Sequence, residues 1–471
     1  MSETKNEKMN LTDKDASSIL DEMNRVIIND NKIGNFMRTY LAIGIANNWE
    51  LPSIFRIIKD CIKIIKIEFF TKKIELAPIS HILKKLNDNP LLTFKKNHKH
   101  HFGLNKSIYD LIEKDKTCLA LDRDLEKSDL DKDTLIFLDE LIPCSDFKIG
   151  KNTRHLFRKV ILIFSNNLKK YNISKIHVIS FYLELRYQIA LFKTFKLIFS
   201  RYKPLFILAE TDAFGALGPL ISAAKQCGIQ TFIHTHGPII YEIGHKPLLA
   251  DKIFCWGKFH YDYFKKLGFN NKDMYITGAP HMKEGLIGDK KLIKSKLKLD
   301  YEYIILIASS NTYANEILKI IKNLITDLPD SYCILIRPHP MEDGKKYKNL
   351  IKNNRLKLFY DIDLNTNDSL LISDVVIVGN TAFLYDTIRM NRVPIVYYFG
   401  NTIYGEINYL EKNDVVPFAY DIKDLHRLIK EITQIDSELK KWISRIKKFK
   451  KIYWHDYGKS AAENIYKKLF N

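Results

Sequence analysis

From about residue 130 to its end, the sequence alternates between short apolar runs and longer segments with helical periodicity. This alternation predicts βα units and a parallel sheet, because each strand in such a sheet is followed by a helix that covers it. Two successive series occur. The strands predicted for the first series are 134–138, 176–179, 205–209, 230–234 and 253–255. Those predicted for the second are 303–308, 332–337, 356–360, 375–378 and 394–398.

The charged stretch 282–300, which contains no aromatic residue, separates the two series. A chain of 471 residues is long enough for two large domains. We therefore predict an α/β protein with two Rossmann-like, doubly wound domains that face a cleft. The predicted parts are a mostly helical N-terminal extension over 1–130, a first domain over 131–290, and a second domain over 291–471 that includes a closing helix. Because ligands of open α/β sheets lie at the carboxyl ends of strands, we expect functional residues directly after strands.

The stretch Arg337-Pro338-His339-Pro340 directly follows a predicted strand. Its prolines stiffen the turn. An arginine offers a forked donor for phosphate, and a histidine can donate to a phosphate oxygen. The motif predicts a phosphate-binding turn, and the competing interpretation is a proline-rich strand exit with a surface histidine.

Two other strand-to-helix turns of the second series are rich in small polar residues. A glycine permits close backbone approach, and the free amides at a helix start favour an anion. Capping of the following helix by the same side chains is the alternative explanation. The predicted donor-binding residues of these turns are Ser309, Ser310 and Asn311 in the first, and Gly379, Asn380 and Thr381 in the second. Neither turn is a Walker loop or a dinucleotide fingerprint.

Candidates for a general base follow two strands of the first series. His236 stands at a strand end and precedes Gly237. A histidine there could take a proton from an acceptor hydroxyl near neutral pH. Glu210 and Asp212 follow another strand, and either carboxylate could be the base or could orient His236. Whether the histidine or an acidic residue is the base stays open, and helix capping by Asp212 is a further alternative.

The 74 Lys and Arg residues exceed the 55 Asp and Glu residues, which gives a net charge of +19. The excess favours anionic partners such as nucleotides, acidic lipid headgroups or nucleic acid, but Lys-rich usage alone could also produce it. The six scattered cysteines predict neither a zinc site nor disulfides. With no apolar leader and no span of about 20 apolar residues, we expect a cytoplasmic protein. A basic amphipathic pattern over 54–66 leaves open a peripheral position on the inner face of the cell membrane, and an ordinary surface helix explains it as well.

The order of these motifs resembles the GT-B enzymes of surface-polymer synthesis. This superfamily comprises CDP-glycerol glycerophosphotransferases of the teichoic-acid type and related capsule polysaccharide, Kdo and polysialic acid transferases. The resemblance extends over about residues 205–465, and its motifs are 236–238 with Gly244, 277–281, 337–340, 373–386, 392–397 and 454–465. It implies that His236 takes the catalytic-base position and that His339 contacts the donor phosphate or nucleotide. It also implies an enzyme that needs no cofactor or catalytic metal.

Two departures from the family pattern bear on the donor. The family's Asp-Tyr-Ser-Ser phosphate loop is replaced by residues 379–382, Gly-Asn-Thr-Ala, and the turn 277–281 ends in His281 where the family has arginine. Both changes favour a sugar donor over a polyol phosphate donor. We therefore expect an inverting glycosyltransferase that moves a sugar from a CMP- or UDP-sugar to a glycan or lipid-linked acceptor in surface polysaccharide (capsule) biosynthesis. The alternatives are a CDP-glycerol-type polyol phosphate transferase, a nucleotide-sugar 2-epimerase, and a non-catalytic nucleic-acid-binding protein.

Overall fold

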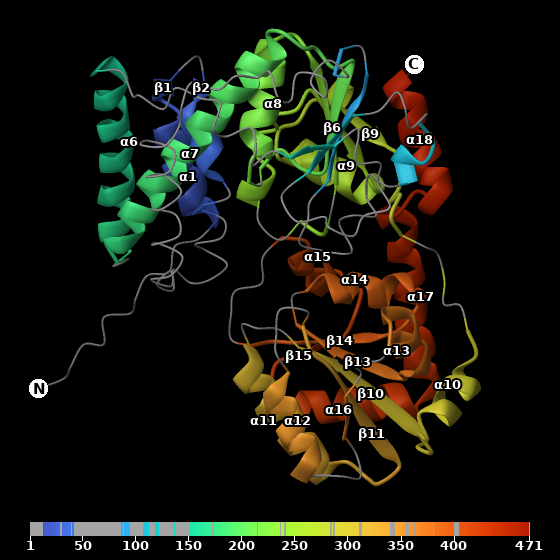
Figure 1. Ribbon diagram of the computed structural model, residues 1–471. Helices are drawn as coiled ribbons and strands as arrows, with labels where there is room; N and C mark the ends of the chain where they lie inside the picture. Colours follow the sequence, from blue (N-terminus) through green and yellow to red (C-terminus); the bar gives the residue numbers. More distant parts are fainter. Residues whose placement is uncertain are drawn as a thin grey trace, which may run out of the picture. The chain divides into compact units, whose positions relative to one another are not determined.

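The chain forms two compact units in a computed structural model (Figure 1). Unit 1 comprises Met1–His236, Tyr241–Met282 and His455–Asn471, and unit 2 comprises Gly237–Ile240 and Lys283–Trp454. The residues that the structure describes are 13–28, 31–38, 40–41, 86–87, 89–94, 107–112, 118–121, 135–137, 151–171, 174–213, 215–235, 237–239, 242–282, 285, 288–309, 313–339, 344–353, 358–360, 364–379, 381–399 and 405–470. The amphipathic pattern predicted over 54–66 lies outside them.

Unit 1 is built on a seven-stranded parallel sheet with the order β5-β4-β3-β6-β7-β8-β9. The chain enters at β3, moves outward to β5 and returns to β6 beside β3, so the strand order reverses between β3 and β6. The strands are β3 Leu91–Phe94, β4 Cys118–Leu121, β5 Leu135–Phe137, β6 Phe206–Ala209, β7 Gln230–His234, β8 Lys252–Cys255 and β9 Met274–Ile276.

The described part of unit 1 also contains helices. They are α1 Asp13–Met23, α6 Lys151–Lys170, α7 Ile176–Phe199, α8 Leu217–Gln226, α9 Lys258–Lys266 and α18 Gly458–Phe470. Short elements complete the described part of unit 1: the antiparallel pair β1 Ile27–Ile28 and β2 Asn31–Lys32, and the 3-10 turns η1 Ile33–Met37, η6 Glu242–Gly244 and η7 Asn271–Asp273.

The strand predicted over 176–179 is wrong, because these residues begin the 24-residue helix α7. Buried side chains occupy most of the circumference of this helix, including those of Phe181, Leu185 and Phe192. A helix that is apolar on nearly every side shows no 3.6-residue period. Its first apolar run therefore looks like a buried strand in the sequence.

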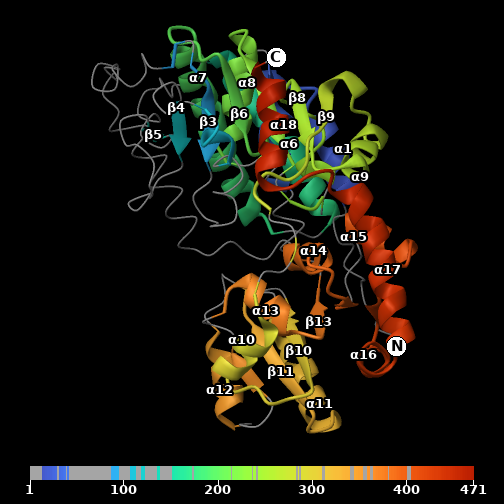
Figure 2. The same ribbon diagram turned by 90° about the vertical axis from the view of Figure 1, so that its right-hand side faces the viewer.

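The N-terminal region differs from the predicted helical extension, because β3 and β4 are inner strands of the sheet of unit 1. The terminal helix α18 also groups with unit 1, although we predicted it in the second domain. Figure 2 shows α18 in red beside β6 and β8, and Ala462 and Ile465 share a hydrophobic cluster with Leu92 and Phe232. The returning chain therefore closes the face of the first sheet, not the second.

The return of the chain is fixed by backbone bonds at the turn 277–281. The Ala279 amide donates to the Asp456 carbonyl at 2.8 Å, and the Gly458 amide donates to the Ala279 carbonyl at 3.1 Å. Gly278 has a φ of +97°, and a Cβ there would lie 2.5 Å from the Asp456 carbonyl oxygen. Only glycine accepts both that conformation and that approach. The turn that we matched to the family pattern is thus the docking point of the C-terminal segment.

Unit 2 contains a six-stranded parallel sheet with the order β12-β11-β10-β13-β14-β15. The strands are β10 Tyr303–Ala308, β11 Tyr332–Arg337, β12 Leu358–Tyr360, β13 Val375–Val378, β14 Pro394–Tyr397 and β15 Phe418–Ala419. The helices are α10 Lys290–Lys296, α11 Ala314–Asp327, α12 Lys345–Asn353, α13 Thr366–Ile372, α14 Ala382–Arg389, α15 Glu406–Lys412, α16 Ile422–Gln434 and α17 Asp436–Tyr453. The strands predicted for the second series are confirmed to within two residues. In the described part of the chain, every helix is too short or too polar to cross a lipid bilayer.

Candidate functional site

Three predicted donor-binding turns lie at one edge of the sheet of unit 2. The strands β11, β10 and β13 are neighbours and run parallel, so their carboxyl ends meet at the same edge (Figure 1). The turn with His339 follows β11, the turn with Ser309 follows β10, and the turn with Thr381 follows β13. Residues from three separate stretches of sequence are therefore brought to one edge, as the βα pattern predicts.

The first two turns are joined directly through Ser309. Its hydroxyl accepts a hydrogen bond from the His339 backbone amide at 3.0 Å, and its own amide donates to the Arg337 carbonyl at 2.9 Å. Ser309 is 3% exposed, whereas His339 is half-buried. A buried serine thus holds the backbone of His339 in place while the imidazole retains access to solvent.

Arg337 binds neighbouring protein groups. Its guanidinium donates to the Ser369 hydroxyl and to the Thr366 hydroxyl, each at 3.0 Å, and to the Leu364 carbonyl at 3.3 Å. The same group lies 5.4 Å from the centre of the Phe383 ring, a cation–π distance. Arg337 therefore links the turn after β11 to the first turns of α13 and α14. The sequence did not point to Ser369, Thr366 or Phe383, because their role depends on a partner about 30 to 45 positions away.

Gly379 lies against the aromatic ring of Phe399, which leaves little space for a side chain. A Cβ at this position would lie 2.9 Å from the Phe399 ring, closer than real Cβ atoms approach. The Phe399 ring in turn stacks on Tyr313, with centroids 4.6 Å apart and planes 4° apart. The phosphate-loop glycine is thus explained by packing from the turns after β14 and β10, an aromatic cluster that the sequence alone did not reveal.

Thr381 precedes α14 with an extended backbone, φ −138° and ψ 159°, and its side chain makes no capping bond. Its hydroxyl oxygen is buried and has no hydrogen-bond partner among the described residues. Helix capping, the alternative explanation for this residue, does not account for its side chain. A buried hydroxyl that bonds no protein group costs free energy unless a ligand or water completes it, and here it stands at the amino end of a helix.

Four predicted residues lie outside the described residues, namely His236, Ser310, Asn311 and Asn380. Their assigned roles stay predictions.

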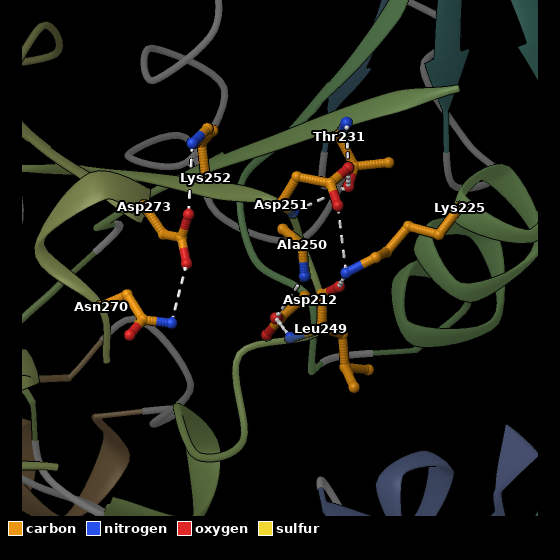
Figure 3. Close-up of polar contacts among 9 residues, drawn as sticks. All are labelled: Asp212, Lys225, Thr231, Leu249, Ala250, Asp251, Lys252, Asn270 and Asp273. Atoms are coloured by element: carbon orange, nitrogen blue, oxygen red, sulfur yellow. Dashed lines mark hydrogen bonds and ion pairs between the residues drawn. The ribbon is translucent and has the colours of Figure 1, made fainter. Parts of the chain in front are cut away.

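In unit 1, the carboxylate of Asp212 binds protein donors on several sides. Its Oδ1 accepts from Arg38 at 2.9 Å, and its Oδ2 accepts from the amides of Leu249 at 2.5 Å and Ala250 at 3.2 Å. Figure 3 shows the bonds from Asp212 to the segment that leads into β8. Asp212 is 1% exposed and Arg38 is fully buried. A proton transfer from a substrate to this carboxylate would require these bonds to break, so the contacts favour a structural role.

Arg38 extends this network to the N-terminal region. Its guanidinium also donates to the carbonyls of Asp212 at 2.8 Å and Pro247 at 2.6 Å. Next along the chain, Asp251 accepts from both the amide and the hydroxyl of Thr231 and pairs with Lys225 at 3.1 Å (Figure 3). Together these contacts anchor the segment 247–251. Glu210, the other predicted carboxylate, is also buried beside β6.

His234 ends β7, two residues before His236, and its environment differs from that of a catalytic base. Complete burial lowers its pKa from the ordinary 6.5 to about 4, against a small opposing contribution from the Thr235 carbonyl. The imidazole therefore stays neutral at pH 7.

Comparison with known proteins finds a family model that matches the C-terminal part of the chain. The family model described as CDP-Glycerol:Poly(glycerophosphate) glycerophosphotransferase matches residues 271–471. This part of the chain carries the sequence pattern of that family. The match agrees with the resemblance drawn from the motifs, and it extends over the second sheet, the donor-binding turns and α18. No curated protein sequence matches the chain.

Solved structures show the fold. A glycosyltransferase of kitacinnamycin is 8% identical with a TM-score of 0.53, covering 82% of this chain and 100% of the other. A putative UDP-N-acetylglucosamine 2-epimerase from Listeria monocytogenes is 9% identical with a TM-score of 0.50, covering 80% of this chain and 94% of the other. The predicted GT-B architecture is thereby confirmed. The fold and the family match together support a transferase of the glycosyltransferase type.

Proposed function

We propose that the chain transfers a sugar from a CMP- or UDP-sugar to a glycan or lipid-linked acceptor in surface polysaccharide biosynthesis. The observation that carries the proposal is the bond between the Ser309 hydroxyl and the His339 amide. It supports a donor site in which an imidazole is held at the carboxyl edge of a parallel sheet, the same edge at which α14 starts with a buried hydroxyl at Thr381. These are groups that bind phosphate.

Each donor-binding residue has a distinct part in the proposal. The His339 imidazole and the Thr381 hydroxyl donate to the phosphate oxygens, where negative charge grows as the nucleotide leaves. The free amides at the start of α14 add to this stabilisation. Arg337 keeps the turns after β11 and β13 together through α13 and Phe383 and is a positioning residue.

We assign the general base to His236. It takes the proton of the acceptor hydroxyl while the acceptor oxygen bonds to the anomeric carbon of the sugar and the bond from that carbon to the phosphate oxygen breaks. This single displacement inverts the anomeric centre and uses no metal ion. The bonds of Asp212 to Arg38 and to two backbone amides support His236 over this carboxylate, which holds the segment 247–250.

Nucleotide release tests the proposal. The purified protein is incubated with CMP-, CDP- and UDP-linked donors, with and without glycan acceptors, and free nucleotide is measured. We expect His339→Ala to lower the rate by about 100-fold or more, the usual effect of losing a donor to developing charge. His426→Ala is the matched control, because His426 lies in α16 of the same unit and pairs with Asp327 at 3.4 Å. No release and no binding with any donor would refute the proposal, and release without acceptor together with an epimerised sugar would indicate an epimerase.

A CDP-glycerol-type transferase is the second candidate, because the family match favours it. The structure of the phosphate loop counts against it. A Cβ at position 379 would lie 2.9 Å from the Phe399 ring, so the aspartate of the resembled family would require this ring to move. Faster release from CDP-glycerol than from every sugar donor would decide for the second candidate.

We further propose that the chain, with its net charge of +19, binds an anionic membrane, where a lipid-linked acceptor would be available. Co-sedimentation with vesicles tests this. Binding to phosphatidylserine vesicles that is lost at high salt is the expected result, and equal binding to neutral vesicles would contradict it.

A further inference from the structure

Glu406 is a buried acid outside the donor-binding turns. It is the first residue of α15 and is 1% exposed. Its carboxylate accepts a hydrogen bond from the hydroxyl of Tyr453. Its backbone amide donates to the carbonyl of Ile239 at 3.0 Å. One residue therefore bonds two segments that are far apart in the sequence.

Tyr453 is held rigidly by other rings. It is fully buried at the end of α17, with ring centroids 5.2 Å from Tyr385, 4.9 Å from Phe449 and 4.4 Å from Trp454. Burial, together with the nearby carboxylate, raises the pKa of Tyr453 well above its usual 10. The phenol therefore keeps its proton and donates to Glu406 across the working pH range.

Both segments are places where the chain passes from one unit to the other. The chain enters unit 2 at Gly237, directly after His236, and leaves it again after Ile240. It leaves unit 2 for the last time after Trp454, the residue next to Tyr453. Ile239 is fully buried, so the segment that follows His236 is anchored and not a free surface loop.

We propose that Glu406 and Tyr453 are positioning residues that hold the segment Gly237–Ile239, and thereby the backbone next to the general base His236. This inference rests on the proposed function, which assigns the base. Tyr453 fixes the Glu406 side chain, the side chain fixes the first turn of α15, and the amide of that turn holds the Ile239 carbonyl.

Packing alone does not explain why Glu406 and Tyr453 are polar residues. A buried carboxylate is costly, and apolar residues of similar volume usually fill such a space at lower free energy. A Glu–Tyr pair instead sets the direction of both side chains, which a catalytic loop needs because small displacements of a reacting group lower the rate strongly.

The chain offers a matched control on the same helix. Glu411 in α15 accepts from the Tyr420 hydroxyl at 2.6 Å, but Glu411 is half-buried, Tyr420 is exposed, and neither is bonded to the segment 237–239. The variants are Glu406→Ala, Glu406→Gln and Tyr453→Phe, with Glu411→Ala and Tyr420→Phe as controls. Glu406→Gln keeps an oxygen acceptor for the phenol, and Tyr453→Phe keeps the ring, so both conserve the fold.

The first measurement is hydrogen–deuterium exchange of the peptides that cover residues 237–243 and 405–410, because the donor of the bond to Ile239 is the Glu406 amide. We expect about 10-fold faster exchange in Glu406→Ala and Tyr453→Phe, near wild-type exchange in Glu406→Gln, and no change in the controls. Unchanged exchange in both Glu406→Ala and Tyr453→Phe overturns the inference. This measurement needs no substrate, so it decides the inference even if the wild type releases no nucleotide, an outcome that refutes only the proposed function.

The second measurement is steady-state nucleotide release. We expect kcat to fall about 10-fold or more in Glu406→Ala and Tyr453→Phe while the donor KM stays within about 2-fold, with recovery in Glu406→Gln. A purely structural role predicts a lower unfolding temperature with unchanged kcat, and that result overturns the inference. A raised KM with unchanged kcat also overturns it, because it would place Glu406 in the donor site.

Discussion

Asp212 in unit 1 and Glu406 in unit 2 are both 1% exposed, but they are satisfied in different ways. Asp212 has a fully buried arginine as its charged partner and accepts from two backbone amides. Glu406 accepts from a phenol, and its own amide holds another segment. The first arrangement neutralises a charge within a permanent core. The second includes a neutral donor, the phenol of Tyr453, which stands in a ring cluster.

The difference shows how each unit holds its own part of the chain between residues 237 and 250. Arg38 and Asp212 anchor the end of this stretch, at Pro247–Ala250. Glu406 anchors its beginning, at Ile239. We infer that the end is held by strong, charge-assisted bonds and the beginning by weaker ones, so the two should respond unequally to substitution.

The largest effect is expected for Arg38→Met. Removing one partner of a buried ion pair leaves an uncompensated charge, which usually costs about 3–5 kcal/mol. Urea unfolding followed by circular dichroism measures the loss. The exposed pair of Lys258 and Asp262, at 2.6 Å, provides the control, and Lys258→Met should cost less than about 1 kcal/mol. Equal urea midpoints for Arg38→Met and Lys258→Met would show that the buried ion pair contributes no more to stability than the exposed one.

Acidification should affect unit 1 through His234. Its pKa is about 4 in the folded protein and about 6.5 when unfolded, so the unfolded state binds more protons between these values. The contribution of neutral His234 to the free energy of unfolding is therefore fully present above about pH 6.5. It decreases as the pH drops towards 4, and the loss is about 2 kcal/mol at about pH 5. Thermal unfolding at about pH 6.5 and about pH 5 measures this loss. The variant His234→Asn should lose the pH dependence that comes from His234. An unchanged dependence in His234→Asn would contradict the assignment.

Tyr453→Phe should destabilise less than Arg38→Met. The variant removes a neutral donor from a buried carboxylate, which costs about 1–3 kcal/mol. Urea unfolding under the same conditions gives the comparison, with Tyr420→Phe as the exposed control at less than about 0.5 kcal/mol. A loss of stability as large as that of Arg38→Met would show that the bonds of Glu406 and of Asp212 contribute equally to the stability of the fold.

The smallest change in stability is expected for Thr381→Val. The hydroxyl of Thr381 has no protein partner among the described residues, so its removal should not lower the free energy of unfolding by more than about 0.5 kcal/mol. Binding of CMP or UDP, measured by calorimetry, should weaken by about 5- to 10-fold, because one hydrogen bond to the ligand is lost. Thr381→Ser keeps the hydroxyl and should bind as the wild type does. Unchanged affinity in Thr381→Val would place the phosphate elsewhere.

Sequence patterns predicted unit 2 better than unit 1. The strands at 303–308 and 332–337 are six-residue apolar runs with clear flanking turns, as is usual for strands buried on both faces. In unit 1, β3 and β4 each have four residues and lie in a region that we predicted as helical. So short a run does not distinguish a strand from part of a buried helix, and α7 shows the opposite error.

The sequence by itself determined that polar residues follow the strands, because the βα pattern places Ser309, His339 and Thr381 at strand ends. Only the tertiary structure decided what each side chain binds. Asp212 meets Arg38 across 174 positions, and Arg337 meets Ser369 across 32. A hydrogen bond requires its two heavy atoms to lie about 3 Å apart, and no local pattern encodes which distant residue the folded chain brings to that distance.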